Sequence, residues 1–222
     1  MVMAAGEGRR LRPITERWPK PVLPIDGRPV VATVLRELRA AGCDRATVVT
    51  GHLAEHVESL VGDGSAFGVR VTYVRQPRTD GSADAVRRAL EAGTPAPVLV
   101  TAADTMFAPG TIAGFLAEWG GAPGAIAARR GHPRSGDKPG LDPRIAPALP
   151  TSAELTSVPL WGIGAELVRF LDDLPGPPYE LADVFGRALD ANVEVRGVVV
   201  PGTRDLTHPL DLIRENFPYL SR

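Results

Sequence analysis

MAAGEGRRLRPITERWPKPVLPIDGRP, residues 3–29, is the part of this 222-residue chain from which its architecture can be predicted. A short apolar run at residues 1–5 leads into it, and the chain then turns at Gly6 and Gly8. Glycine has no Cβ, so the backbone can adopt a positive φ there and its N–H groups can approach an anion closely. The pattern predicts the end of a strand followed by a phosphate-binding loop.

Cations follow directly after this turn. Arg9, Arg10 and Arg12 offer charge-assisted hydrogen bonds to phosphate oxygens. Lys20 lies between two prolines, which stiffen the backbone from which its ammonium group extends. An isolated pair of arginines is usually a simple surface feature. Here the glycines, cations and prolines all favour one task, the binding of an anion.

The same stretch resembles the signature of the sugar-1-phosphate nucleotidylyltransferases, which join a nucleoside triphosphate to a sugar 1-phosphate. The family pattern is roughly Ala-Gly-x-Gly-Thr-Arg-Leu-x-Pro-x-Thr, then Pro-Lys-Pro and a later Gly-x-Pro. The chain departs from it at Arg9, where Thr is usual, and matches it at Gly6, Gly8, Arg10, Leu11, Pro13, Thr15, Pro19, Lys20, Pro21, Gly27 and Pro29. The resemblance implies that Arg10 and Lys20 are catalytic. It also implies nucleotide contacts from Ala4, Ala5, Gly6, Gly8 and Arg9.

Composition limits the classes of function. The chain is 44% hydrophobic, enough for a substantial core, and its net charge of −1 argues against a nucleic-acid partner. Cys43 is the only cysteine, which excludes an intrachain disulfide and a cysteine metal cluster. No targeting segment or long apolar span is visible, so we expect a cytoplasmic protein without a membrane partner. The first strand of such folds usually has more lead-in than Met1 and Val2, which leaves the start of the chain in question.

Short apolar strands alternate with helical patterns over residues 1–128, which predicts an α/β fold with a mostly parallel, Rossmann-like sheet covered by helices on both faces. This is also the nucleotide-diphospho-sugar transferase fold that the resemblance implies. We expect one domain over 1–222, with a Pro/Gly-rich loop at 130–152 that closes over substrate. Strand patterns occur at 1–5, 46–50, 69–74, 98–102, 125–128 and 193–200, with ordered structure at 155–163. Helical patterns occur at 30–41, 52–61, 82–92, 109–119, 166–174, 180–191 and 209–219.

Two aspartates are candidate metal ligands. Asp104 follows the buried strand at 98–102, where an unpaired carboxylate would lose hydration, and it shares the carboxyl rim of the sheet with residues 6–20. Asp205 lies in TRDLTHPLDLIREN, which resembles the family's Trp-x-Asp-Ile and Thr-Pro-x-Asp-Leu pattern, with Thr203 in place of Trp. The resemblance implies Mg²⁺ on both aspartates, and Mg²⁺ usually takes only one or two protein carboxylates. The alternatives are a helix cap for Asp104 and a residue that merely precedes the last helix for Asp205.

Residues 75–86, RQPRTDGSADAV, resemble the segment that reads the base. Gln76 offers a donor and an acceptor that suit the imide edge of uracil or thymine, which favours dTTP or UTP over CTP or GTP. Gly81 would allow close approach of the base, and Ser82 occupies a position of the family's Gly-Thr-Ala core. The alternative for Gln76 is a loop residue facing solvent.

The acceptor side is matched by short fragments only. Lys138 lies in Asp-Lys-Pro, close to the family's Glu-Lys-Pro, and Gly162 lies where the family has a strand near the sugar. Glu180 lies in Tyr-Glu-Leu, close to Phe-Glu-Leu, and would either bind a sugar hydroxyl or simply begin a helix. His52 and His56 are spaced for a metal site on one helix, but a solvated helix face is the stronger interpretation.

These residues together predict nucleotidyl transfer from a nucleoside triphosphate to a sugar 1-phosphate, with release of pyrophosphate. Two alternatives remain open: the same chemistry on another acceptor such as phosphocholine, and a non-catalytic domain that binds a nucleotide sugar. The sequence does not identify the base, the sugar or the oligomeric state, a homo-oligomer included.

Overall fold

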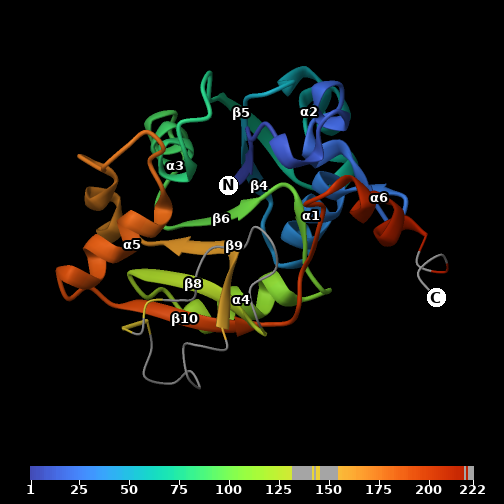
Figure 1. Ribbon diagram of the computed structural model, residues 1–222. Coiled ribbons are helices and arrows are strands. Elements are labelled where there is room, and N and C mark those ends of the chain that lie inside the picture. Colours follow the sequence, from blue (N-terminus) through green and yellow to red (C-terminus); the bar gives the residue numbers. More distant parts are fainter. Residues whose placement is uncertain (132–141, 143, 146–154, 218, 220–222) are drawn as a thin grey trace.

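The computed structural model describes residues 1–131, 142, 144–145, 155–217 and 219 (Figure 1). Its main sheet has seven strands in the order β10-β8-β9-β6-β1-β4-β5. The strands are β1 (Val2–Ala4), β4 (Arg45–Thr50), β5 (Arg70–Arg75), β6 (Val98–Ala102), β8 (Gly124–Arg130), β9 (Leu155–Ile163) and β10 (Val195–Val200). β9 runs antiparallel to both of its neighbours, and the other pairs are parallel. The predicted mostly parallel α/β fold is confirmed.

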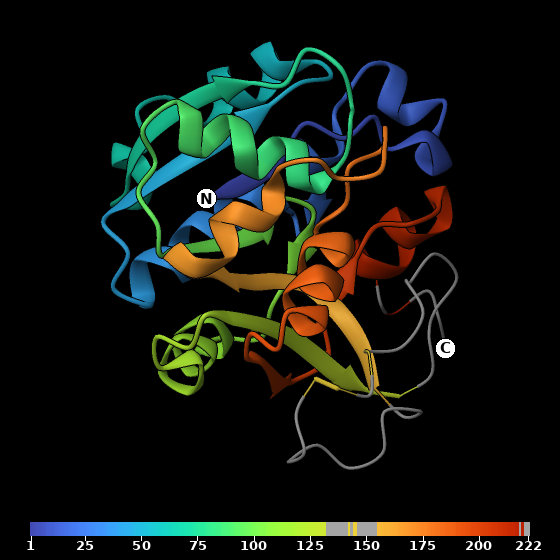
Figure 2. The ribbon, with the colours of Figure 1, turned by 90° about the vertical axis from the view of Figure 1, so that its left-hand side faces the viewer.

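Helices cover both faces of this sheet. α1 (Val30–Ala40), α2 (Ala54–Val61) and α4 (Thr111–Trp119) contribute to one buried apolar cluster. α3 (Ser82–Glu91), α5 (Leu181–Asp190) and the 3-10 segment η6 (Ala165–Leu171) contribute to the other, and they lie in front of the sheet in Figure 2. The structure therefore has three layers. Among the described residues, none of the helices has the length and apolar character that crossing a bilayer requires.

The apolar patterns explain these layers. In α1 the predicted face of Val30, Val31, Val34, Leu35 and Leu38 is fully buried, because helical spacing places these side chains on one side. β6 is buried at Val98, Leu99 and Val100, as expected of a central strand covered on both faces.

Two short antiparallel ribbons lie outside the main sheet. β2 (Pro24–Ile25) pairs with β3 (Arg28–Pro29), and β7 (Thr105–Met106) pairs with β11 (Arg204–Asp205). The last helix, α6 (Pro209–Asn216), follows β11. The loop expected at 130–152 falls almost wholly outside the described residues, so this loop and the single domain over 1–222 stay predictions.

The segment expected to be an amphipathic helix at 166–174 is instead the 3-10 turn η6. Its buried residues, Leu167 and Leu171, have the predicted spacing, so the apolar pattern identified the correct face. The turn ends because the backbone becomes extended at Asp172 and takes a positive φ at Asp173, and the Arg187 guanidinium donates to both of their carbonyl oxygens at 2.8 and 2.5 Å.

Gly162 has a packing role rather than the expected acceptor contact. It pairs with Leu99, near the amino end of β6, whereas the predicted site follows the carboxyl end of that strand. A Cβ on Gly162 would lie 2.5 Å from the indole ring of Trp119. The glycine is therefore needed for the close approach of β9 to α4.

We expect Gly162→Ala to lower the free energy of unfolding by about 2 kcal/mol, because the added methyl group overpacks the core against Trp119. Urea denaturation measures the effect. The matched control is Gly186→Ala in α5, where a Cβ meets nothing within 4 Å. That change should raise stability by about 0.5–1 kcal/mol. An unaltered Gly162→Ala protein would contradict the packing role.

Candidate active site

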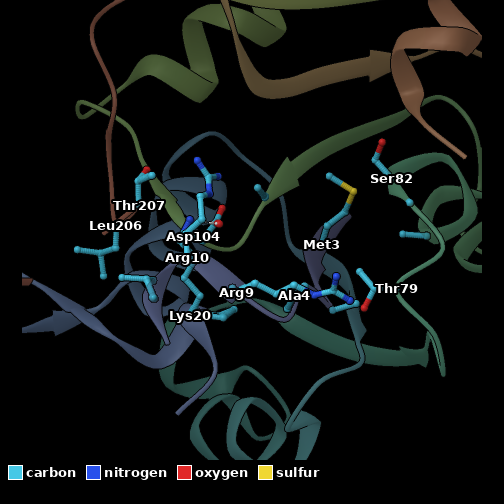
Figure 3. Close-up of a pocket in the computed structure, with 18 of the residues that line it drawn as sticks. Met3, Ala4, Arg9, Arg10, Lys20, Thr79, Ser82, Asp104, Leu206 and Thr207 are labelled. Atoms are coloured by element: carbon cyan, nitrogen blue, oxygen red, sulfur yellow. Dashed lines mark ion pairs between the residues drawn. The ribbon is translucent and has the colours of Figure 1, made fainter. Parts of the chain in front are cut away.

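A cleft of about 400 Å³ lies at the carboxyl ends of β1 and β6 (Figure 3). Leu206 and Thr207 lie at one end of it, and Thr79 and Ser82 at the other. Most of the residues selected from the sequence line this one cleft: Ala4, Ala5, Gly6, Gly8, Arg9, Arg10, Lys20, Gly81, Ser82, Asp104 and Glu180. The predicted meeting of the glycine-rich loop with the strand-end carboxylate is thus observed.

Lys20 and Asp104 form an ion pair in this cleft, with 2.6 Å between the Lys20 Nζ and Asp104 Oδ2 atoms. The lysine side chain is 14% exposed and the aspartate 31% exposed, so water screens the pair less than it screens a surface pair. Lys20 begins the 3-10 turn η3 (Lys20–Val22) after the extended Pro19. The prolines therefore fix the stem from which the ammonium reaches the carboxylate.

Gly8 shapes the loop that surrounds this pair. Its φ is +62°, and a Cβ would lie 2.9 Å from the Thr15 Cγ2 atom. The Gly8 carbonyl accepts hydrogen bonds from the Leu11 amide at 2.8 Å and the Thr15 hydroxyl at 3.0 Å. His52 lies ahead of α2, not on it, and its Nε2 donates to the Thr15 carbonyl at 2.8 Å. The expected solvated helix face is therefore wrong for His52, which anchors the loop.

Gly6 differs from Gly8 because nothing lies within 4 Å of the place that its Cβ would occupy. Gly6 also lines the cleft, so this open space faces the region available to a ligand. The internal structure of the loop does not require a glycine at this position. We expect the missing Cβ to let a ligand approach the main chain closely here.

Arg9 is held outward by a carboxylate on the same loop. Its Nε donates to the Glu7 Oε2 at 2.8 Å, and its side chain is 74% exposed. The hydrogen bond from Arg9 lowers the pKa of Glu7. A phosphate that binds Arg9 must therefore compete with Glu7. Arg10, the next residue, lines the cleft as well.

Gln76 is 3% exposed and lies buried beneath the loop before α3, which it supports through hydrogen bonds. Its Nε2 donates to the Gly81 carbonyl at 3.0 Å and to Asp84 Oδ2 at 2.9 Å. The alternative of a solvent-facing residue is wrong. The expected contact with a base edge is not supported either, because the amide nitrogen is bound within the protein and Gln76 is not among the residues lining the cleft. Thr79 is the residue of this loop that lines the cleft and that sequence analysis missed.

Asp84 is the buried anchor of this arrangement. Arg87 and Arg88 donate to its two carboxylate oxygens at 2.8 and 2.7 Å. Burial would raise the pKa of Asp84, but the hydrogen bonds from Arg88, Gln76 and Arg87 outweigh it and leave the pKa below its usual value. The ionised carboxylate therefore fixes Gln76, and through it the Gly81 turn.

The loop before α3 is bound to the segment before α5. Tyr179 and Asp80 share a main-chain hydrogen bond of 2.7 Å, and the Ala83 amide donates to the Tyr179 carbonyl at 2.9 Å. The Ser82 hydroxyl donates to Glu180 at 2.6 Å and accepts from the Leu181 amide at 2.9 Å. A Cβ on Gly81 would collide with the Tyr179 main chain. Gly81, Ser82 and Glu180 thus lie together on one wall of the cleft.

The remaining predicted residues differ in position. Lys138 lies outside the described residues. Asp205 does not line the cleft in the way that its neighbours Leu206 and Thr207 do, but β11 places it directly opposite Thr105, the residue after Asp104. Thr207 was matched by the sequence pattern without being identified as a site residue.

Asp104, which lines the cleft, and Asp205, opposite Thr105 in the β7–β11 ribbon, are the two carboxylates that the sequence pattern predicts to hold a divalent cation. Within the described part of the chain, His, Cys, Asp and Glu form no group of three or more that could hold a metal. Two carboxylates, completed by substrate phosphates and water, are the donor set that Mg²⁺ usually has in phosphate-binding sites. The residues present therefore fit a cation brought in together with a triphosphate.

Comparison with known proteins matches the family model described as "Nucleotidyl transferase" to residues 1–118, more than half of the chain. The chain belongs to the nucleotidyl transferase family. The matched region carries the glycine-rich loop, Lys20, the α3 loop and Asp104, so the family membership and the cleft involve the same residues.

Relatives within this family align over short regions. A UTP–glucose-1-phosphate uridylyltransferase from Synechocystis is 48% identical over 33% of this chain and 19% of its own length. A glucose-1-phosphate thymidylyltransferase from Streptomyces griseus is 41% identical over 39% of this chain and 24% of its own length. The aligned part thus spans about a quarter or less of these two relatives.

The fold similarity extends over nearly the whole chain. A solved structure of UDP-glucose pyrophosphorylase complexed with UDP-glucose superimposes with a TM-score of 0.80 at 18% identity. The superposition covers 99% of this chain and 97% of that one. At this level of identity the match supports the fold of the family alone.

We expect Gly6→Ala to affect ligand binding and Gly8→Ala to affect stability. Gly6→Ala should leave the melting temperature unchanged but weaken binding of inorganic triphosphate about tenfold, because its methyl group enters the cleft. Gly8→Ala should cost about 1–2 kcal/mol of stability, because its φ is positive and Thr15 lies in the way. Calorimetry and thermal denaturation separate the two. Unaltered triphosphate binding by Gly6→Ala would contradict the ligand role of that position.

Asp84 should make the free energy of unfolding depend on pH in the acidic range. A carboxylate whose pKa is lowered by folding adds stability above its unfolded pKa, about 3.9, and this stability is lost as the pH falls through the folded pKa. Asp84→Asn should therefore cost about 2 kcal/mol at pH 7 and show a flatter decline below about pH 4. Urea denaturation across pH measures both. Glu91→Gln, on the same helix and 64% exposed, is the control and should stay within about 0.5 kcal/mol.

Proposed function

We propose that this protein transfers a nucleotidyl group from a nucleoside triphosphate to a sugar 1-phosphate, giving a nucleotide sugar and pyrophosphate. The observation that carries the proposal is the Lys20–Asp104 ion pair in the cleft beneath the glycine-rich loop. A cation and a carboxylate held 2.6 Å apart beside an anion-binding loop suit a reaction in which several phosphates must be brought together. Membership of the nucleotidyl transferase family supports the same reaction class.

In the proposed reaction an oxygen of the sugar 1-phosphate forms a bond to the α-phosphorus of the triphosphate. The bond from that phosphorus to the oxygen bridging to the β-phosphate breaks in line, and pyrophosphate leaves with the electron pair. Arg10 and the main chain of the loop from Gly6 would bind the β- and γ-phosphates. Lys20 would leave Asp104 to contact the α-phosphate and the attacking phosphate, where negative charge is concentrated.

Enzymes of this family generally depend on a divalent metal. We propose Mg²⁺, held by Asp104 and Asp205, because two hard carboxylate ligands leave room for phosphate oxygens. When bound, the cation would screen the repulsion between the two substrates and stabilise charge on the phosphates. The role of the protein is then to keep the two carboxylates in register, which the pairing of β11 with β7 favours.

We propose that the base binds along the loop before α3 and that thymine or uracil is preferred. The preference is supported by relatives that are named uridylyl- and thymidylyltransferases. The acceptor would lie against Glu180, whose carboxylate is oriented by the Ser82 hydroxyl at 2.6 Å. Gln76 would act indirectly, by fixing the Gly81 carbonyl.

We expect Lys20→Ala and Asp104→Ala each to lower turnover at least a hundredfold while the fold persists, because each removes a charge that faces the phosphates. Pyrophosphate release is measured with dTTP, UTP, CTP and GTP against glucose 1-phosphate and phosphocholine in the presence of Mg²⁺. Circular dichroism checks the fold.

Arg45→Ala and Asp44→Ala are the matched controls for this experiment. They remove one cationic and one acidic side chain at the amino end of β4, where both side chains are 76% exposed. Turnover of both should stay within about twofold of the unaltered protein. Full activity in Lys20→Ala would contradict the proposed role of the ion pair. Nucleotide-sugar binding without pyrophosphate release under all conditions would favour a non-catalytic binding domain instead.

A further inference from the structure

Arg204, the residue immediately before Asp205, makes an unusually complete set of contacts. Its NH1 and NH2 groups donate to the two carboxylate oxygens of Asp26 at 2.6 and 2.9 Å. Its Nε donates to the Glu215 side chain at 2.5 Å, and NH2 also donates to the Glu215 carbonyl at 3.2 Å. One guanidinium thus joins the β2–β3 hairpin to the end of α6. Asp26 in the hairpin lies 178 residues before Arg204 in the sequence.

Further hydrogen bonds close the same junction. The Asn216 side chain donates to the Pro24 carbonyl at 2.9 Å and accepts from the Gly27 amide at 2.8 Å. The Asp26 amide donates to the Glu215 carbonyl at 3.3 Å. The hairpin and α6 therefore form a unit in which the single positive charge of Arg204 is shared between two carboxylates.

This unit is connected to the two segments that carry Lys20 and Asp205. The hairpin directly follows η3, the turn that begins with Lys20, and the Leu23 amide donates to the Lys20 carbonyl at 3.1 Å. On the other side, Arg204 and Asp205 make up β11, which pairs with Met106 and Thr105 next to Asp104. Arg204 thus joins the hairpin that follows the Lys20 turn to β11, the ribbon strand that carries Asp205.

Strand geometry indicates what this junction does to Asp205. Successive side chains of a strand point to opposite sides of it. Because the Arg204 side chain is held on the side of Asp26 and Glu215, Asp205 is turned to the other side of the ribbon. Rotation of β11 about its axis would require the bidentate pair with Asp26 to break.

We propose that Arg204 is a positioning residue that sets the orientation of Asp205 relative to the Lys20–Asp104 pair and thereby the affinity of the site for a divalent cation. The inference rests on the proposed function, because it assumes that Asp205 is a metal ligand. Arg204 does not contact the cation or the substrates. It acts through the main chain of β11.

The test is a titration with Mn²⁺ alone, followed by the loss of the free-ion electron paramagnetic resonance signal. Arg204→Gln should weaken Mn²⁺ binding about tenfold, as removal of an outer partner of a metal ligand usually does. Arg204→Lys should recover only part of the loss, because a single ammonium group cannot span both carboxylates. Asp26→Asn keeps Arg204 and its bond to Glu215, and should cause a smaller loss of about threefold.

Arg196→Gln is the matched control. Arg196 is 42% exposed, against 39% for Arg204, and it likewise bonds a glutamate side chain and main-chain carbonyls. It lies near the start of β10, an outermost strand of the sheet, whereas the cleft lies at the carboxyl ends of the central strands β1 and β6. Its replacement should leave Mn²⁺ affinity within about twofold while having a similar effect on stability.

The outcomes are distinguishable. If Asp205→Asn loses Mn²⁺ affinity but Arg204→Gln and Asp26→Asn do not, the positioning role is overturned and the proposed metal site stands. If Asp205→Asn keeps full affinity, the metal role of Asp205 and this inference both fail. If Arg204→Gln does not fold, Asp26→Asn alone decides, and unaltered Mn²⁺ binding in that variant overturns the inference.

Discussion

Parallel pairing of β1 with β6 is the constraint on which the candidate site depends. Because neighbouring parallel strands end at the same edge, the glycine-rich loop after Ala4 and the carboxylate after Ala102 must come together. The 2.6 Å contact of Lys20 with Asp104 then requires only that the loop return to this edge, which the packing of Gly8 against Thr15 ensures. The chemistry of the site is thus a consequence of strand direction and of one sterically restricted turn.

Much of this could be predicted from the sequence, since local patterns carry it. The buried face of α1 follows from helical spacing, and the parallel sheet follows from alternating short strands and helices. Gly6, Gly8, Arg10, Lys20 and Asp104 were identified because glycines, cations and a strand-end carboxylate occur together in a pattern that resembles a known family, and all of them line the cleft.

Long-range contacts could not be predicted in the same way. Gln76 has the chemistry to read a base, but its amide nitrogen is bound to Gly81 and Asp84, and the position of Asp84 becomes known only when α3 is built. Gly162 matched a strand pattern, but the reversed direction of β9 takes it to the other end of the sheet. His52 looked like a helix residue because the register of α2 is set by packing and not by composition.

The main-chain ladder between residues 80–83 and 179–181 has a consequence for how such a protein can diversify. The two segments form one wall of the cleft and are joined largely by backbone atoms, so most side chains there can be exchanged without separating them, Gly81 and Ser82 being the exceptions. Changes at Thr79 then alter the lining of the cleft while the backbone of this wall keeps its shape. The residues that line this wall can therefore vary in evolution while the main chain that supports them stays unchanged.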